Sequence, residues 1–342
     1  MKDSIFYKLN SGKPIKAIYF FRKYLEFLIP DSYYRHKLRS TIENASKRKD
    51  YDYILQRFAY YCKLDKQWQI DSADYTKKTT ETFFFRGKIG NYKRNMFHTA
   101  YYLDQHDVTK WFDKNYRWCY CPGDVYFTPN EPTVVKSRML TEDNTNSVVL
   151  KLDKLRHFVF LNDVTPFEKK QNKAIFRGKI RKSRLRTKFL EKFFGNPMID
   201  CGIVGKNEGF PEEWMTEKKT IREHLSYKFI IALEGNDVAS NLKWVMSSNS
   251  LAVMTRPTCE TWFMEGKLVA GVHYVEVKED FSDLEEKMNY YINHPEEAQK
   301  IIENAHKYIE QFKDNKREDL IQLMVMNKYF YLSKQMPAYY KI

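Results

Sequence analysis

The sequence predicts an α/β protein of two domains, on three observations. The chain has 342 residues, which is long for one hydrophobic core and sufficient for two. Between residues 170 and 312, short apolar runs alternate with helical segments, the pattern of a parallel sheet with Rossmann-like winding. A polar stretch at 162–172 precedes this half. We therefore expect an N-terminal domain at 1–165, a C-terminal domain at 166–315 and a C-terminal helical segment at 316–342 that packs back on the first domain.

The N-terminal half begins with helices and continues as a mixed pattern. Residues 1–70 are expected to be mostly helical, with a break at Pro30. A polar loop should follow at 71–82. The next expected elements are the strand TFFFRGKI, a helix at 94–113, an aromatic run at 116–121 with a Pro-Gly turn, and the strand-like TVVKSRML with a polar loop at 141–146. Residues 148–160 fit either a strand or a short helix.

The C-terminal half has clearer boundaries. The strand AIFRGKI precedes a helix at 183–194, which Gly195-Asn196-Pro197 should end. Ser282-Asp-Leu-Glu285 has the spacing of a capping box, and Pro295 should start a helix whose apolar side chains keep helical spacing. The other expected elements are a strand at 198–204, a helix at 217–226, a strand at 227–233, a strand at 250–254 and the strand GVHYVEV at 271–277.

Residues 227–250 are the most informative segment for function. The apolar run YKFIIAL predicts a buried strand, and the polar loop Glu234-Gly235-Asn236-Asp237 follows it directly. ASNLKWVM then predicts a helix with Asp237 as its N-cap. In a parallel βαβ unit this helix would begin at the carboxyl edge of the sheet, where backbone N–H groups favour phosphate. A nucleotide or nucleotide sugar is therefore the expected ligand class.

Composition narrows the class of protein. Hydrophobic residues make up 43% and charged residues 30%, so the chain is globular, and its net charge of +14 favours anionic partners. Five scattered cysteines and no visible signal peptide indicate reduced thiols in the cytoplasm. No run of about 18 apolar residues spans a bilayer. The aromatic and basic segment 15–29 fits a packed amphipathic helix or a helix in the membrane interface.

Several charged side chains are candidates for chemistry. Arg177 and Gly178 end a predicted strand, and basic residues follow at Lys179, Arg181, Lys182, Arg184 and Arg186, which suits a diphosphate or simply a solvated helix face. Glu260 follows the expected strand at 250–254 and is either a ribose ligand or a surface carboxylate. Asp124 and Glu131 lie on a Pro/Gly-rich loop, where a carboxylate can act as a general base or simply shape a turn.

Three segments resemble glycosyltransferase family 90. They are AIFRGKI with its basic helix, YKFIIALEGNDVASNLKWVMSSNSLAVM, and ETWFMEGKLVAGVHYVEVKEDFSDLEEKM. The stretch from EPTVVKSRML to AIFRG is most similar to the bacterial lipopolysaccharide core transferases of that family, rather than to its capsule-associated or Rumi-type members. The resemblance covers roughly residues 116–312, and the first ~80 residues carry none, as a variable acceptor-facing region would.

The resemblance implies a GT-B-like fold, with two Rossmann-like domains facing across a cleft. It implies an N-terminal acceptor-side domain, a C-terminal nucleotide-sugar-binding domain, and an inverting transfer from a UDP-sugar of glucose, galactose or xylose type. Asp124 falls near the catalytic Asp of the family, with Glu131 as its rival, and no metal and no cofactor beyond the UDP-sugar co-substrate are expected. The donor-binding residues carried over are Arg177, Gly178, Arg184, Glu234, Gly235, Asn236, Asp237, Val238, Ala239, Ser240, Asn241, Lys243 and Glu260.

One position departs from the family pattern. Many members have an Arg in the helix after the diphosphate loop, and this chain has Asn241 there. The charge of the diphosphate must then be met by Arg177, Arg184, Lys243 and the helix dipole. The identity of the donor sugar is therefore not carried over.

The sequence as a whole predicts a glycosyltransferase acting on a surface glycan such as lipopolysaccharide core or capsule. Its expected partners are the UDP-sugar, a glycan or glycolipid acceptor and an anionic membrane surface, without nucleic acid. It would be cytoplasmic, peripheral at the inner membrane. Two alternatives stay open: another nucleotide-sugar enzyme, such as an epimerase or hydrolase, and a non-catalytic basic protein that binds anionic glycan or nucleic acid. The absence of GxGxxG after a strand argues against a dinucleotide cofactor.

Overall fold

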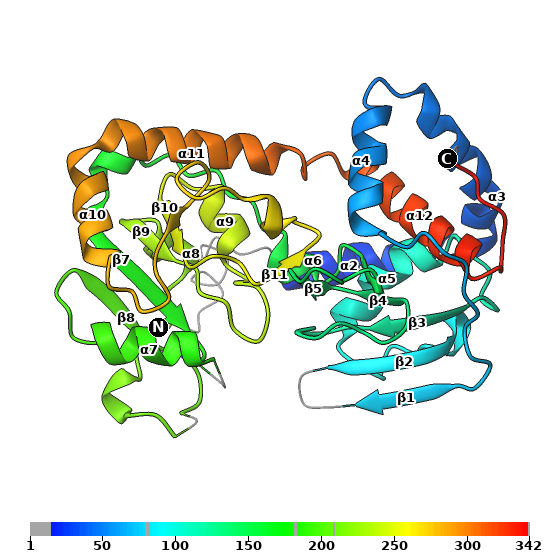
Figure 1. Ribbon diagram of the computed structural model, residues 1–342, viewed down its shortest axis with the longest axis horizontal. Helices are drawn as coiled ribbons and strands as arrows, with labels where there is room; N and C mark the ends of the chain where they lie inside the picture. Colours follow the sequence, from blue (N-terminus) through cyan, green and yellow to red (C-terminus); the bar gives the residue numbers. More distant parts are fainter. Residues whose placement is uncertain (1–14, 79–81, 181–182, 208, 341–342) are drawn as a thin grey trace. The chain divides into compact units, whose positions relative to one another are not determined.

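The computed structural model describes residues 15–78, 82–180, 183–207 and 209–340 (Figure 1). It contains two compact units, which are described separately. Unit 1 is formed mainly by Arg156–Thr258 and Glu265–Gln311. Unit 2 is formed by Ala17–Leu155, Cys259–Met264 and the chain from Phe312 onward. Along the chain the change of unit falls at Leu155/Arg156, ten residues before the boundary expected from the sequence.

Unit 1 alternates strands and helices, as the sequence predicts. Its regular elements are η3 (Phe167–Lys169), β7 (Gln171–Gly178), α7 (Arg184–Phe193), β8 (Ile199–Ile203), η4 (Glu212–Trp214), α8 (Ile221–His224), β9 (Tyr227–Ile231), α9 (Leu242–Met246), β10 (Leu251–Met254), η5 (Glu265–Lys267), β12 (Val275–Glu276), α10 (Leu284–Asn293) and α11 (Pro295–Glu310). The order α/β/α/β along this half confirms the predicted α/β class.

The five strands of unit 1 form one parallel sheet in the order β12-β10-β9-β7-β8. If the strands are numbered 1 to 5 along the chain, their order in the sheet is 5-4-3-1-2. The chain therefore goes from β7 in the interior to β8 at one edge, and then continues on the other side of β7 to the opposite edge. Such a doubly wound sheet has its switch point between the first and third strands, here β7 and β9. The carboxyl ends of these two central strands therefore border the place where open α/β sheets bind ligands.

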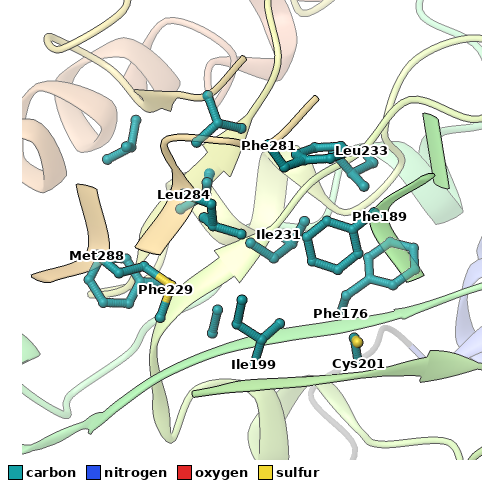
Figure 2. Packing of buried hydrophobic residues seen from close by; sticks show 14 of the residues in the cluster. Phe176, Phe189, Ile199, Cys201, Phe229, Ile231, Leu233, Phe281, Leu284 and Met288 are labelled. Atoms are coloured by element: carbon teal, nitrogen blue, oxygen red, sulfur yellow. The ribbon is translucent and has the colours of Figure 1, made fainter. Parts of the chain in front are cut away.

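A hydrophobic core fills one face of this sheet (Figure 2). Alternate side chains of the central strands, among them Phe176, Phe229 and Ile231, point into it, as the two-residue period of a strand requires. Phe189 of α7 packs edge-on against Phe176, with ring centroids 5.4 Å apart. Helices α10 and α11 add Leu284, Met288, Ala298, Ile301 and Ile302. The helical spacing predicted for the segment after Pro295 is therefore confirmed.

Unit 2 combines a mixed sheet with a group of helices. Its elements are α2 (Lys16–Glu26), α3 (Asp31–Glu43), η1 (Asn44–Lys47), α4 (Tyr51–Tyr61), β1 (Tyr75–Lys78), β2 (Phe83–Lys88), η2 (Ile89–Asn91), α5 (Thr99–Thr109), β3 (Arg117–Cys121), β4 (Thr133–Val135), β5 (Ser137–Met139), β6 (Ser147–Val149), β11 (Cys259–Thr261) and α12 (Asn315–Leu332). The short helix α6 (Lys154–His157) spans the change of unit along the chain.

The sheet of unit 2 has the order β1-β2-β3-β4-β6. Strands β1, β2 and β3 pair antiparallel, whereas β3, β4 and β6 pair parallel, so the last three share one carboxyl edge. Strands β5 and β11 form a separate antiparallel ribbon. Helix α12, within the segment expected to pack back on the N-terminal domain, packs against α3, α4 and α5.

Several expected elements differ in the structure. The loop expected at 71–82 contains β1, which is exposed and held by pairing with β2 rather than by an apolar pattern of its own. The helix expected at 94–113 is the shorter α5, and GVHYVEV forms only the two-residue strand β12. The capping box at 282–285 is wrong: Asp283 is the N-cap of α10, but its carboxylate accepts from Lys278 N at 2.9 Å and makes no cap bond. A genuine capping box joins Thr220 and Glu223 at α8.

The helix expected after the 234–237 loop is also shorter than predicted. Helix α9 has only five residues and begins at Leu242, with Asn241 and not Asp237 as its N-cap. Asp237, Val238 and Ala239 are buried in non-helical backbone before it. Burial of this loop fixes it in a conformation that local propensity does not predict, so the helix expected over ASNLKWVM begins only at Leu242.

Candidate active site

The candidate site of unit 1 lies at the carboxyl ends of β7 and β9. Arg186, in the first turn of α7, holds these ends together: its guanidinium donates to Leu233 O at 2.8 Å and to Lys179 O at 2.7 Å. Ser183 caps α7, and its hydroxyl also donates to Glu234 O at 3.1 Å. Because α7 is capped and anchored there, the chain leaving β9 is fixed against the chain leaving β7.

Gly235 allows the guanidinium of Arg186 to lie against the backbone of the loop. A Cβ at this position would be 3.0 Å from Arg186 Nη2 and 3.2 Å from Cζ. A side chain at this position would therefore require the guanidinium to move by a few tenths of an ångström. The glycine is explained by this close approach, since its φ is not in the left-handed region.

Glu234 ties the loop to the segment after β10. Its carboxylate accepts from Thr258 N at 3.1 Å and from Thr258 Oγ1 at 2.5 Å. Asn236 and Ser240 are half-buried, and Asn241 donates from Nδ2 to Ile231 O at 3.1 Å. The predicted residues 234–241 are thus brought together at the sheet edge, and Asn241 closes the end of β9 by a neutral hydrogen bond where the family pattern has a cation.

Lys243 does not face this edge. Its ammonium pairs with the carboxylate of Glu265 inside unit 1, and both side chains are almost fully buried. A buried ammonium is stable only when it is paired, so this contact has a structural role. The sequence places Lys243 among the diphosphate ligands, and the structure pairs its ammonium with Glu265.

Arg177 and Arg184 differ in their surroundings. The Arg177 guanidinium pairs with the Asp200 carboxylate of the neighbouring strand β8, and it donates to Phe176 O and Asp200 O, each at 2.9 Å. Arg184 is exposed in the first turn of α7. Gly178 ends β7, where a Cβ would meet the Phe176 ring at 2.9 Å. Arg181 and Lys182 lie outside the described residues.

The Asp200 carboxylate is held in its charged form. Burial by itself would raise its pKa, but hydrogen bonds from Tyr227 and Arg177, with the charge of Arg177, hold the pKa below its ordinary value. Tyr227 Oη donates to Asp200 Oδ2 at 2.5 Å. Asp200 therefore links β7, β8 and β9 at their side chains, a contact that the sequence pattern does not predict.

In unit 2, Asp124 lies just beyond the carboxyl end of β3. Pro122 and Gly123 separate it from the strand, and Gly123 has a φ of 103°, which favours glycine at this turn. Lys136, directly after the parallel strand β4, places its Nζ 2.9 Å from Asp124 Oδ1. The Lys136 side chain is buried and the Asp124 side chain is 19% exposed. A buried ammonium therefore holds a carboxylate that is partly open to solvent.

Glu131 lies at the opposite edge of the same sheet. It precedes β4, whereas Asp124 follows β3, and these strands run parallel. Its Oε1 accepts from Arg86 of β2 at 3.1 Å. Burial, together with the charge and hydrogen bond of Glu131, raises the pKa of the Cys119 thiol. The two candidate bases are thus held by different cations at different edges.

Glu260 belongs to unit 2, whereas the other predicted donor residues belong to unit 1. It lies on β11 opposite Arg138 of β5, and its Oε1 accepts from Arg138 Nε at 2.7 Å. Its Oε2 accepts from the Tyr60 hydroxyl, and burial followed by the charge of Glu260 raises the pKa of that phenol. The carboxylate is 1% exposed, so both of its oxygens are engaged in the interior.

Sequence reasoning misses Lys136, Arg138 and Asp200. One signal was available: TVVKSRML contains two cations inside an apolar run, and charges in such a place are buried only when paired. Within the described ranges, no group of three or more His, Cys, Asp or Glu side chains is placed to hold a metal ion. Those ranges also contain no helix long and apolar enough to cross a membrane.

Comparisons with known proteins show which sequences the chain is similar to. The sequence model of Glycosyl transferase family 90 matches residues 145–340. The chain is 42% identical over 234 residues to O-glucosyltransferase LpsA of Dichelobacter nodosus, covering 68% of this chain and 73% of that protein. It is 30% identical over 142 residues to human Protein O-glucosyltransferase 3, covering 40% of this chain and 27% of that one. It is 28% identical over 140 residues to Protein O-glucosyltransferase 2 of Danio rerio, covering 40% of this chain and 28% of that protein.

Proposed function

This chain belongs to glycosyltransferase family 90 and is a glycosyltransferase, and we propose that it transfers glucose from UDP-glucose to a hydroxyl of a bacterial surface glycan. Glucose is favoured over galactose and xylose because each of the three relatives described above is named an O-glucosyltransferase. The acceptor we propose is lipopolysaccharide core, on the resemblance of EPTVVKSRML and the following residues to that branch of the family. Family membership decides against the non-catalytic basic protein and against an epimerase or hydrolase.

One observation favours donor binding in unit 1. Arg186, Gly235 and Glu234 fix the loop after β9 at the switch point between β7 and β9. We propose that UDP binds there, with the exposed Arg184 and backbone N–H groups of the 235–240 loop on the diphosphate. The two units would be the two domains of a GT-B architecture, unit 2 receiving the acceptor. Cationic side chains would neutralise the leaving diphosphate, so the proposed reaction uses no metal.

Asp124 is the proposed general base. The acceptor hydroxyl oxygen attacks the anomeric carbon while Asp124 accepts its proton. The bond between that carbon and the UDP oxygen breaks, and UDP leaves with the electron pair, so the configuration inverts. The support is the position of Asp124 beyond a rigid turn, oriented by Lys136 and open to solvent. Glu131, at the other edge, is the alternative base.

We place the protein at the cytoplasmic face of the inner membrane, where a glycolipid acceptor would be presented. The support is that all five cysteines are buried free thiols, as in a reducing compartment.

The test is a transfer assay with UDP-glucose, UDP-galactose and UDP-xylose against purified lipopolysaccharide core lacking terminal glucose. We expect release of UDP and a product heavier by one hexose with UDP-glucose alone. Thermal shift with each nucleotide sugar measures binding separately, because a ligand of the folded state raises Tm. Preference for another sugar would overturn the assigned donor. A thermal shift without transfer would overturn the assigned acceptor.

A further inference from the structure

Helix α2 is attached to unit 2 through its polar side chains. The Tyr19 hydroxyl donates to Asp104 Oδ1 at 2.6 Å, and Lys23 pairs with Asp107, both on α5. Glu26 accepts from Lys110 Nζ at 2.8 Å. The groups that usually face water on an amphipathic helix are therefore turned toward the protein.

The opposite face of α2 is apolar and uncovered by the described residues. Ile18, Phe21 and Leu25 follow at spacings of three and four, which puts them on one face, and they are 54%, 65% and 46% exposed. Leu28, just after the helix, is 77% exposed. None of the residues of α2 is buried. An ordinary surface helix has the reverse arrangement, and a contiguous exposed apolar patch of this kind marks an interaction site.

The charges around this apolar stripe are positive. Arg22 is exposed and follows Phe21 at the border of the stripe, and the single carboxylate of the helix, Glu26, is paired with Lys110. Arg94, also exposed, donates to the Tyr24 hydroxyl at 3.0 Å at the border of the stripe. An apolar strip with a tyrosine and a cationic border has the composition of a helix that lies in a membrane interface.

We propose that α2 docks unit 2 onto an anionic lipid bilayer. Ile18, Phe21, Leu25 and Leu28 would enter the boundary of the acyl chains, and Arg22 and Arg94 would lie among the headgroup phosphates. Charge complementarity selects this occupant: a second copy of the chain would present the same positive border, whereas anionic lipid presents the opposite sign. Docking on lipid does not depend on the proposed function. Only its use in reaching a glycolipid acceptor rests on that function.

The polar contacts to α5 explain why the helix can present its apolar face. Two ion pairs and one hydrogen bond hold α2 without burying any apolar side chain of the stripe. Among the described residues the stripe is therefore left exposed by contacts that are themselves part of the fold.

Co-sedimentation of the full chain with vesicles tests the proposal. The vesicles contain phosphatidylcholine with or without phosphatidylglycerol. We expect binding to the anionic vesicles, and at least about tenfold weaker binding for Phe21→Ser/Leu28→Ser, which removes two large apolar side chains. Arg22→Gln should weaken binding to anionic vesicles about fivefold, as one basic residue near such a surface contributes about 1 kcal/mol.

Matched controls come from exposed residues of unit 1. Val164→Ser/Val269→Ser removes two exposed apolar side chains outside α2 and should leave vesicle binding unchanged, as should Lys188→Gln for the charge. Wild-type protein that does not sediment with anionic vesicles would overturn the proposal, and so would equal binding by Phe21→Ser/Leu28→Ser.

Two further readouts separate the alternatives. Analytical ultracentrifugation tests for a dimer. If wild type is a dimer that Phe21→Ser/Leu28→Ser loses, and wild type does not bind vesicles, the stripe contacts a second copy and lipid docking is overturned. Transfer of glucose to a soluble core oligosaccharide is measured in parallel. A protein that transfers but does not bind vesicles contradicts the docking alone, and one that binds vesicles without transfer contradicts the proposed function alone.

Discussion

Lys136 Nζ lies 2.9 Å from Asp124 Oδ1, and the two residues come from the carboxyl ends of neighbouring parallel strands. The lysine is 1% exposed and the aspartate 19%, so a buried cation supports a carboxylate that is partly exposed to solvent. A side chain held in this way loses little further freedom when it meets an acceptor hydroxyl, which is a requirement for a positioned base.

Asp124→Asn should lower kcat by about 10²–10⁴-fold, because the amide keeps the shape and the contact with Lys136 but cannot accept a proton. The affinity for UDP should stay within a few-fold, since unit 1 is unchanged. Steady-state kinetics and calorimetric titration with UDP measure the two quantities. Glu131→Gln is the matched control: if it abolishes turnover while Asp124→Asn is active, the base has been assigned to the wrong carboxylate.

Gly235→Ala should weaken UDP binding about tenfold and destabilise unit 1 by about 1–3 kcal/mol, because its Cβ would stand 3.0 Å from Arg186 Nη2. In the background of Arg186→Ala the cost of Gly235→Ala should shrink, since the clash is gone. Additive effects in this double-mutant cycle would refute the explanation.

Arg177→Ala should lower the free energy of unfolding by about 1.5–3 kcal/mol, because it removes charge-assisted hydrogen bonds to Asp200 and to two carbonyls. The resemblance also predicts a donor affinity weaker by about one to two decades. Asp200→Asn removes the ion pair but keeps the guanidinium, so it should share the loss of stability and retain donor affinity. A folded Arg177→Ala protein with an unchanged donor Kd would leave this arginine a purely structural role.

The ion pair between Arg177 and Asp200 should also make the stability of the fold depend on pH in the acidic range. The pKa of Asp200 lies below its ordinary value of 3.8 in the folded chain, so its contacts stabilise the fold fully above that value and are lost as pH falls through the lowered pKa. Urea unfolding at a series of pH values from about 6 to about 3 should therefore show a steeper loss of stability for wild type than for Asp200→Asn. Parallel curves for the two proteins would contradict the assignment.

Glu260→Gln should destabilise unit 2 by about 3–5 kcal/mol, because it leaves the buried Arg138 without its anion. Replacing both partners, as in Glu260→Gln/Arg138→Met, should restore part of that stability, since no unpaired charge remains. Thermal and urea unfolding measure both effects. If Glu260→Gln is as stable as wild type and loses UDP affinity instead, the carboxylate acts on the ribose as the family resemblance implies.

Elements with local signals are predicted well from the sequence. The helix α7 is recognisable because Ser183 caps it and Gly195 ends the segment with a positive φ of 83°. The five buried apolar residues of α11 repeat at helical spacing after Pro295. In each case a short window contains the start signal, the stop signal and the face that packs.

Contacts between distant residues are what the sequence does not predict. Lys243 is predicted as a diphosphate ligand, and nothing nearby indicates its partner, Glu265, which lies 22 residues further along the chain. Glu260 pairs with Arg138 across 122 residues, and nothing near either residue indicates this. The long helix expected after Asp237 fails for a related reason, because tertiary burial of the loop overrides its helical propensity.

Helix α12 has a consequence for synthesis of the chain. It follows all of unit 1 in the sequence, yet it completes the interior of unit 2: Glu318 accepts from Arg57 and from Trp262 Nε1, and the Tyr329 hydroxyl joins Cys119 N to Pro132 O. A nascent chain has all the strands of unit 1 before this helix emerges from the ribosome. The synthesis of unit 2 thus begins before that of unit 1 and ends after it, and until α12 arrives the buried Arg57 lacks the carboxylate of Glu318.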